Sequence, residues 1–434
     1  MRVSIIVIVL CLSTSVFSQD SKFTAQDAIR LALEQNLSIQ LAQTNLDIAS
    51  INNNWGNAGA LPIITANIAN TEAVSNIDQK LSSGSNIQRS NVANNTLNSN
   101  IGVSWRIYNG YKIKATKERF VTIEQIGEIA FKQQIDQVIY DVLNSYYNIV
   151  RLNKQIASIS AIIDLSKERL KIAETRFNVG SGAKTDMLQA KIDLNTQEIN
   201  LQNIQKQVQN SKAIINALLK RDPSAPFDAS EVQFSIPSID YNSFSDKIES
   251  QNRDILIAEK ERALLISERK IINSQRNPTA TINSNTYLNR SQASAGLFLI
   301  NQSYGPNIGL SFGIPIFNGN IYKTQLKVNS VMQKQKSIEI NALKNDLRRD
   351  MLIAYQEYQN AVADAKIEET NVTYAEENNM ISTERFKKLQ SNSIELRQAQ
   401  LSLSEAQDRY INAQYRAQVA AYTLKFITGE ISKF

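Results

Sequence analysis

The sequence contains no histidine and a single cysteine, Cys11. Without histidine it lacks the commonest general base and the commonest protein ligand for zinc. One cysteine cannot form an intramolecular disulfide, and it cannot build a thiolate metal cage. The sequence also has no Gly-rich phosphate loop, no metal-ligand spacing and no nucleophile elbow. We therefore expect no enzyme activity, and no catalytic, cofactor-binding or metal-binding residues.

No apolar stretch of the sequence is long enough to cross a bilayer as a helix. The longest, Val3–Leu12, has about ten residues, whereas a helix that crosses a bilayer needs about 20. It follows a positive start, and Val16–Ser18 ends on a small residue, which is the layout of a secretory signal peptide rather than of a membrane anchor. We expect residues 1–18 to be removed, so that the mature chain begins near Gln19 without Cys11 and without lipid.

The sequence has no large excess of positive or of negative charge. The 47 Lys and Arg residues nearly balance the 41 Asp and Glu residues, for a net charge of +6. Nucleic-acid-binding proteins usually concentrate basic residues in a patch or stripe, and no such run occurs here. We therefore expect no nucleic-acid partner.

The chain repeats itself at an offset of about 209 residues. Asn109-Gly110 returns as Asn318-Gly319, and Arg176-Phe177 returns as Arg385-Phe386. A constant offset between similar motifs indicates a duplication. The mature chain therefore divides into a first repeat, a linker and a second repeat, at residues 19–220, 221–242 and 243–434.

Helix breakers are rare over most of each repeat. No proline lies between Tyr111 and Arg221, and neither proline nor glycine occurs from Asn320 to Thr428. Such stretches favour continuous helix. We expect a first helix of about 67 residues in each repeat, which is roughly 100 Å at 1.5 Å per residue. The long helix pairs are predicted at about 111–220 and 320–428, with returning helices at about 185–219 and 393–427.

Apolar residues at heptad spacing, with small residues between them, predict that these helices pair as coiled coils. A shorter helix opens each repeat, and Thr24 is the expected N-cap of the first. These shorter helices are predicted at about 24–54 and 243–275.

Alternating apolar and polar residues precede each long helix. The alternation is complete in Asn307–Ile314 and nearly complete in Leu97–Arg106. Period two indicates strands with one apolar face and one polar or small-residue face. Transmembrane strands of about 9–11 residues have this pattern, and the edge of a soluble sandwich is the alternative. The β-hairpins are predicted at about 61–107 and 278–317, with loops at about 74–94 and 289–303. The face expected to meet lipid includes Leu97, Ile101, Val103, Ile308, Leu310, Phe312 and Ile314.

The order of these features resembles the TolC-like outer-membrane efflux proteins over nearly the whole mature chain. The matching motifs are Ile316-Phe317-Asn318-Gly319 after a strand, Arg176-Phe177-Asn178-Val179-Gly180 before a helix turn, and the pair Tyr146 and Tyr355. The sequence departs from the family's pattern at Leu389, which stands where the first repeat has Gly180, and at Lys114 and Lys323, where the family usually has arginine.

The resemblance implies a mixed α+β membrane protein: a trimeric, twelve-stranded β-barrel continued by an α-helical periplasmic tunnel. Strand geometry agrees, because four strands cannot close a barrel, eight leave no open lumen, and lipid does not tolerate an open sheet edge. The implied function is an outer-membrane exit duct of a tripartite efflux or type I secretion system that passes drugs or secreted proteins. The implied partners are two further copies of the chain, a periplasmic adaptor (membrane fusion) protein, an inner-membrane pump and outer-membrane lipid.

Two other classes of protein stay open at this point. A periplasmic coiled-coil adaptor or scaffold would account for the helices but needs no alternating strands. A carboxylate hydrolase would need an isolated pair of acids, whereas the acids here lie on helix faces beside Lys and Arg, as solvated ion pairs do.

The turns between long and returning helices, at 180–184 and 389–392, would lie about 100 Å from the strands. We predict that they dock the adaptor. The alternative is structural, with the phenylalanines closing each hairpin and the arginines pairing with nearby acids. The candidate docking residues are Arg176, Phe177, Gly180, Ser181, Thr185, Arg385, Phe386, Leu389 and Asn392.

Asp186 and Glu395 occupy equivalent places in the first turns of the returning helices. An acid there interacts favourably with the helix dipole by about 0.3–1 kcal/mol, which is a sufficient structural explanation. The functional alternative is a gate at the tunnel mouth. The two acids would then form a ring of like charge, or a latch with Arg176 or Arg385 of a neighbouring helix.

Overall fold

The computed structural model describes residues 23–230, 233–296 and 298–433, so the predicted signal peptide at 1–18 lies outside the described residues. The chain forms two compact units, and each contains segments of both repeats. The tip unit consists of the described residues up to Asn36, Val138–Ser238 and Gln356–Thr423. The strand unit consists of Leu37–Gln137, Ile239–Tyr355 and the chain from Leu424 onward. The compact units therefore cut across the sequence repeats.

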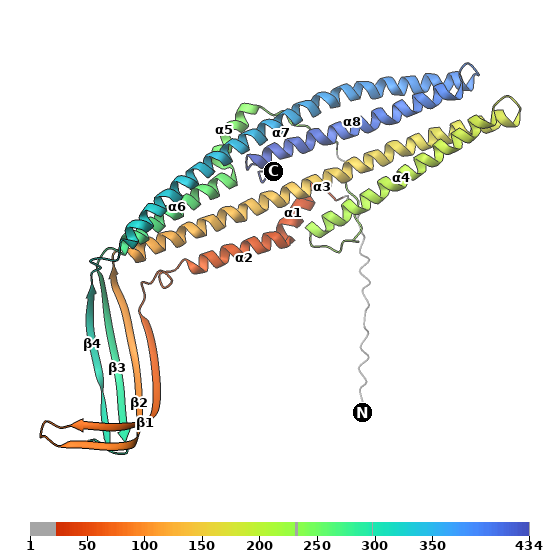
Figure 1. Cartoon of the computed structure of the whole chain (residues 1–434). Coiled ribbons are helices and arrows are strands. Elements are labelled where there is room, and N and C mark those ends of the chain that lie inside the picture. Colours follow the sequence, from red (N-terminus) through yellow and green to blue (C-terminus); the bar gives the residue numbers. More distant parts are fainter. Residues whose placement is uncertain (1–22, 231–232, 297, 434) are drawn as a thin grey trace, which may run out of the picture. The chain divides into compact units, whose positions relative to one another are not determined.

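Two long helical hairpins provide most of the helical structure (Figure 1). Both long helices have 67 residues and both returning helices have 35, in agreement with the lengths expected from the scarcity of helix breakers. The first hairpin joins α3 (Lys112–Asn178) to α4 (Lys184–Leu218), and the second joins α7 (Ile321–Lys387) to α8 (Ser393–Ile427).

The core of the tip unit is apolar and closely packed. Tyr146 and Ile149 of α3 are fully buried, and so is Ala417 of α8. The small residues of the α8 heptad seam, such as Ala399 and Ala413, are also buried. Small side chains at these positions let helix backbones approach one another, as the heptad pattern predicts.

The helix predicted at 24–54 is interrupted, so the prediction of one continuous helix is wrong. Thr24 does cap α1 (Ala25–Gln35), in a capping box with Asp27. The helix then stops at Asn36, whose backbone is extended, before α2 (Leu37–Asn52) begins. The Asn36 side-chain amide donates to the carbonyl oxygen of Leu218 at 2.7 Å, which ties the break to the last residue of α4.

The helix predicted at 243–275 is interrupted in the same way. Asn252 is extended between α5 (Tyr241–Gln251) and α6 (Arg253–Ser274), and its side-chain oxygen caps α6. Its amide donates at 2.8 Å to the carbonyl oxygen of Ile427, the last residue of α8. Each repeat therefore uses one asparagine to break its first helix and to bond the end of its returning helix.

Two tyrosines fasten the linker to the long helices of the tip unit. The Tyr146 hydroxyl donates to the carbonyl oxygen of Phe23 at 2.9 Å and lies 2.8 Å from the Ser230 hydroxyl. In the second repeat Tyr358 donates to the carbonyl oxygen of Pro237. Tyr355, the offset counterpart of Tyr146, instead packs its ring against Tyr241 in the strand unit. The hydrogen bond from a long helix to the linker backbone is thus made about one helical turn farther along α7 than the repeat offset predicts.

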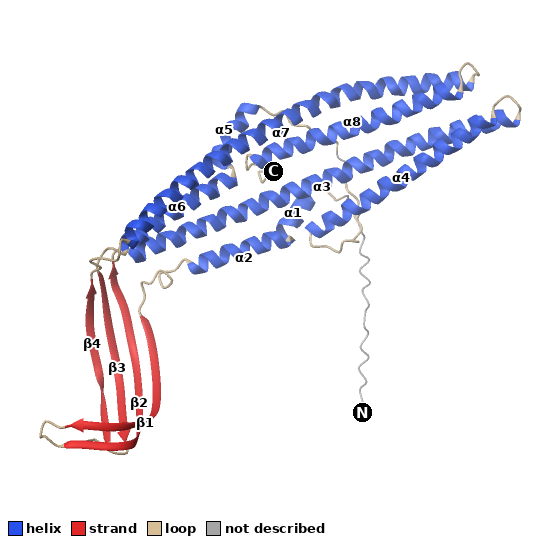
Figure 2. Ribbon diagram, viewed as in Figure 1, coloured by secondary structure: helices blue, strands red, loops and turns tan. Residues whose placement is uncertain are grey.

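The strand unit contains one antiparallel sheet in the order β1-β2-β3-β4 (Figure 2). The strands are β1 (Ile63–Lys80), β2 (Asn86–Asn109), β3 (Thr279–Ala293) and β4 (Ile300–Gly313). They are longer than predicted, and the expected loops at 74–94 and 289–303 shrink to 81–85 and 294–299. The prediction failed because asparagine and serine were interpreted as loop residues. A strand ladder satisfies backbone groups whatever the side chain, so polar segments can extend a hairpin.

A glycine in a left-handed conformation connects the sheet to each long helix. Gly110 and Gly319 both have φ of +66°. A methyl group added at Gly110 would overlap the carbonyl oxygen of Ser274 and lie 2.5 Å from Cβ of Asn277, whereas one added at Gly319 would meet nothing within 4 Å. Both junctions therefore favour glycine because of the left-handed backbone, and the first also requires it because a side chain would clash with its neighbours.

Candidate functional site

The tip unit contains two turns between helices, one from α3 to α4 and one from α7 to α8 (Figure 1). Their backbone hydrogen bonds follow the same pattern. In the first, the carbonyl oxygen of Arg176 accepts from the backbone amides of Ser181 and Gly182, at 2.9 and 3.0 Å. In the second, the carbonyl oxygen of Arg385 accepts from the backbone amide of Gln390 at 2.9 Å. These bonds satisfy carbonyls at a helix end, where no intrahelical donor remains.

Gly180 and Leu389 hold the same position in these turns. Their φ angles are +75° and +62°. Glycine adopts this left-handed conformation freely, whereas a leucine pays about 1–2 kcal/mol for it. The Leu389 side chain is 69% exposed, so it gains little packing in return. Both predicted docking positions are exposed.

One arginine and one phenylalanine of the predicted pairs meet across the two hairpins. The guanidinium of Arg176 lies over the ring of Phe386, with 3.9 Å between its centre and the ring centroid, and it also donates to the Phe386 carbonyl oxygen. Phe386 is 1% exposed and Phe177 is 38% exposed. Arg176 and Phe386 therefore join the hairpins, while Phe177 remains accessible.

An ion pair joins the same two helices nearby. The Lys387 ammonium of α7 lies 2.9 Å from a carboxylate oxygen of Glu168 on α3. The hydrogen bond to Glu168 raises the pKa of the Lys387 side chain. The first repeat has no equivalent lysine, because the residue at the matching position is Asn178.

The two gate candidates differ in their contacts. Glu395 forms an ion pair with Arg385 of its own hairpin at 2.5 Å and accepts from the Ser391 hydroxyl at 2.7 Å. Its backbone amide donates at 2.9 Å to the side chain of Asn392. Asp186 is exposed in the first turn of α4, next to the exposed Thr185. Glu395 of α8 is thus paired with Arg385 of α7, the neighbouring helix of the same hairpin.

A charge cluster on three helices, with one buried member, was missed by the sequence analysis. Asp193 of α4 lies 2.5 Å from Arg169 of α3 and 2.9 Å from Arg397 of α8, and it accepts from Gln189 at 2.9 Å. The Arg169 side chain is only 3% exposed. A signal was available, because Arg169 places a charge on a helix face that also holds the buried apolar residues Ile162 and Ala173.

The strand register places the predicted lipid-facing residues on one face of the sheet. Val103 pairs with Ser284, which pairs with Ile308 in turn. Opposed residues of antiparallel strands point to the same face, and that face repeats at every second residue. By this rule the shared face holds Leu97, Ile101, Val103, Ile308, Leu310 and Phe312. Ile314, the seventh predicted member, lies just beyond the end of β4.

The opposite face of the sheet is polar. Across it, Ser104 pairs with Asn283, and Asn98 pairs with Asn289. The Ser104 hydroxyl donates to the Asn283 side chain at 2.9 Å. Small and amide side chains of this kind suit contact with water rather than with a packed core.

Within the described part of the chain, no helix combines the length and the apolar character that crossing a membrane requires. No group of three or more metal-ligating side chains is found among the same residues.

Comparison with known proteins agrees with this architecture. The chain is 22% identical to nodulation protein T of Rhizobium leguminosarum bv. trifolii over 403 residues, which cover 87% of this chain and 79% of that protein. Among solved structures, the outer membrane protein VceC of Vibrio cholerae superposes with a TM-score of 0.75 at 18% identity, over 93% of this chain and 96% of that one. The outer membrane channel CmeC of Campylobacter jejuni gives a TM-score of 0.79 at 15% identity, over 94% and 85%.

The model of the outer membrane efflux protein family matches residues 28–219 and 244–430, most of each sequence repeat. This match confirms the TolC-like resemblance, and with it the outer-membrane location and the function as an exit duct. The family consists of transport channels rather than enzymes. The chain belongs to the outer membrane efflux protein family.

Proposed function

We propose that three copies of this chain close a twelve-stranded barrel in the outer membrane and combine their helical hairpins into a periplasmic tunnel. The tunnel receives drugs or secreted proteins from an inner-membrane pump, and a periplasmic adaptor protein holds pump and tunnel together. Family membership favours this channel over the alternative of a coiled-coil scaffold without a pore.

The proposal is supported mainly by the sheet, which has one apolar face, one polar face and two edge strands. In the described sheet, β1 and β4 are the outer strands, each paired on one side within the chain. Unpaired strand edges are too costly in lipid, so four strands must find further strands to pair with. Twelve strands leave an open lumen where eight would be filled by side chains. The apolar face would then contact lipid, and the asparagine-rich face would line the lumen.

The direct test compares two neighbouring residues of β4. Leu310 pairs with Ile282 on the apolar face, and Ser311 pairs with Thr281 on the polar face. Arginine on the lipid face near the midplane costs about 2–4 kcal/mol, whereas the lumen accepts it. Leu310→Arg should therefore sharply lower the yield of heat-resistant trimers in membranes, and Ser311→Arg should not. Equal tolerance of both variants would contradict the barrel.

Adaptor docking is proposed for the exposed part of the tips. Gly180, Ser181, Thr185, Leu389 and Asn392 occupy or adjoin the two turns. A Cβ added at Gly180 meets nothing within 4 Å in the chain, so a bulky replacement there adds left-handed strain but no clash at Cβ. Loss of efflux with intact trimers would therefore point to the adaptor. Gly182→Ala is the structural control, since its methyl group would lie 2.8 Å from Cβ of Arg176.

Gating by Asp186 and Glu395 is proposed with unequal roles. Glu395 is held by Arg385 and so suits a latch, whereas the exposed Asp186 suits a charged ring. In planar bilayers, Glu395→Gln should raise conductance, and cells that carry this variant should leak more antibiotic. Asp186→Asn should instead reduce cation selectivity at unchanged mean conductance, because a ring of acids attracts cations. Wild-type behaviour of both variants and of their double mutant would leave the acids as helix caps only.

A further inference from the structure

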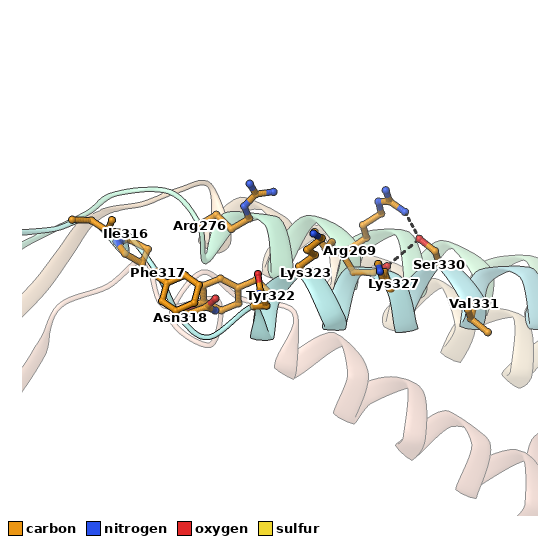
Figure 3. Close-up of a pocket in the computed structure, with 13 residues that line it drawn as sticks. Arg269, Arg276, Ile316, Phe317, Asn318, Tyr322, Lys323, Lys327, Ser330 and Val331 are labelled. Atoms are coloured by element: carbon orange, nitrogen blue, oxygen red, sulfur yellow. Dashed lines mark hydrogen bonds between the residues drawn. The ribbon is translucent and has the colours of Figure 1, made fainter.

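A basic groove lies where β4 leads into α7 (Figure 3). Its volume is about 990 Å³, and it is lined by α6, by the segment between β4 and α7, and by the first turns of α7. Four of its side chains are cationic: Arg269, Arg276, Lys323 and Lys327. Arg269 is held in place by a hydrogen bond to the Ser330 hydroxyl at 2.9 Å. All of these residues belong to the strand unit.

The charge of the groove is not neutralised as it is elsewhere on α7. Farther along the helix, Lys336 lies 2.6 Å from Glu261 and Lys344 lies 3.1 Å from Glu249. None of the described residues that line the groove is acidic. The sequence from Arg269 to Ile338 contains no aspartate or glutamate at all. Cations from both sides of the groove thus face a shared space that an anion could fill.

Apolar and aromatic side chains border these cations. Ile316 and Phe317 are 95% and 79% exposed, and Tyr322 lines the groove beside them. They come shortly after Phe312, the last apolar residue of the row on β4, and after Ile314 just beyond that strand. Aromatic residues beside basic ones are typical of the level at which a membrane strand meets lipid headgroups.

We propose that this groove binds the phosphate of an anionic phospholipid in the periplasmic leaflet of the outer membrane. The inference rests on the proposed placement of β4 in the barrel. Arginine and lysine side chains would neutralise the phosphate, and arginine can bond two of its oxygens at once. The apolar row from Phe312 to Phe317 would carry the acyl chains. This continuity with the lipid face is the reason for assigning the anion to a lipid rather than to soluble phosphate.

The test counts lipids bound to the intact trimer by native mass spectrometry. Wild type, K323Q/K327Q and the control K334Q/K366Q are purified in detergent and given phosphatidylglycerol or phosphatidylcholine. Lys334 and Lys366 are exposed on α7 outside the groove, so the control removes the same charge. We expect wild type and control to retain phosphatidylglycerol over phosphatidylcholine, and the groove variant to lose at least fivefold of the retained phosphatidylglycerol.

Further outcomes separate the possible ligands. Displacement of phosphatidylglycerol by millimolar glycerol 3-phosphate would assign the groove to soluble phosphate and overturn the lipid proposal. Equal retention by the groove and control variants would overturn it as well. Loss of trimers in K323Q/K327Q alone, with unchanged retention by those that remain, would make the groove a contact between copies of the chain. Trimer yield and conductance are read on the same samples, so a failure of the channel proposal would be seen independently.

Discussion

The first and second hairpin tips share their backbone and differ in their side-chain contacts. Equivalent carbonyls, of Arg176 and Arg385, accept the turn hydrogen bonds, and equivalent residues adopt the left-handed conformation. Yet Phe386 is buried beneath Arg176 while Phe177 is accessible, and Glu395 is ion-paired while Asp186 is exposed. Duplication has preserved what the backbone requires, and the side chains have diverged to fit different neighbours.

The largest difference should appear between the two phenylalanines. Phe386→Ala removes a fully buried ring and should cost about 3–5 kcal/mol. Phe177→Ala removes a partly exposed ring and should cost under about 1 kcal/mol. Hydrogen–deuterium exchange at the end of α7 should rise strongly only for Phe386→Ala. Similar exchange in both variants would show that the tips are energetically equivalent after all.

A second difference is expected at the junctions between sheet and helix. Gly110→Ala combines left-handed strain with overlap against Ser274 and Asn277, for about 2–5 kcal/mol in total. Gly319→Ala meets only the strain, about 1–2 kcal/mol. The midpoint of thermal unfolding in detergent should fall further for Gly110→Ala. If Gly319→Ala is the worse variant, the packing of the first junction has been misjudged.

The two helix-breaking asparagines should behave alike. Asn36→Ala and Asn252→Ala each remove a bond to the last carbonyl of a returning helix. We expect each to cost about 1–2 kcal/mol, which is typical of a lost cap or a carbonyl left without its donor. The unfolding midpoints of the two variants should agree closely. A larger loss for Asn252→Ala alone would instead measure the cap that this side chain also provides to α6.

The smallest effect is expected at Leu389. Leu389→Gly relieves about 1–2 kcal/mol of left-handed strain but restores freedom to the unfolded chain, which opposes it by about 0.4–1 kcal/mol. Stability should therefore rise slightly or stay unchanged, whereas Gly180→Leu should lower it by about 1 kcal/mol. A clear loss of stability in Leu389→Gly would reveal a packing role for this exposed side chain.

Features that depend on local sequence were predicted well. The long and returning helices follow from the scarcity of proline and glycine, and the apolar row on one face of the sheet follows from the alternation of apolar and polar residues. The breaks at Asn36 and Asn252 were not predicted, because their partners Leu218 and Ile427 lie far away in the sequence. The motif Gln-Asn at 35–36 and again at 251–252 was the available signal.

For the candidate sites, the sequence predicted where the residues lie along the chain but not which side chains they contact. Repeat symmetry located both tips, but it also treated Phe177 and Phe386 as equals. Their difference arises from Arg176, which reaches one ring across the hairpins and leaves the other exposed. Asp193 was missed for a similar reason, since its partner Arg397 lies 204 residues away in the sequence.

The unequal lengths of the two β-hairpins have a consequence for the cell surface. Pairing of β1 with β2 continues to Lys80 and Asn86, whereas β2 and β3 pair only as far as Asn94 and Ala293. The outer end of the β1–β2 ribbon therefore extends beyond β3 and β4, and it turns aside near the bulge at Ser75 (Figure 1). Three such ribbons around a barrel would therefore lean sideways at its outer end instead of rising above it (Figure 1). Antibodies or phage arriving from outside would then meet the flank of each bent ribbon as well as the turns at 81–85 and 294–299.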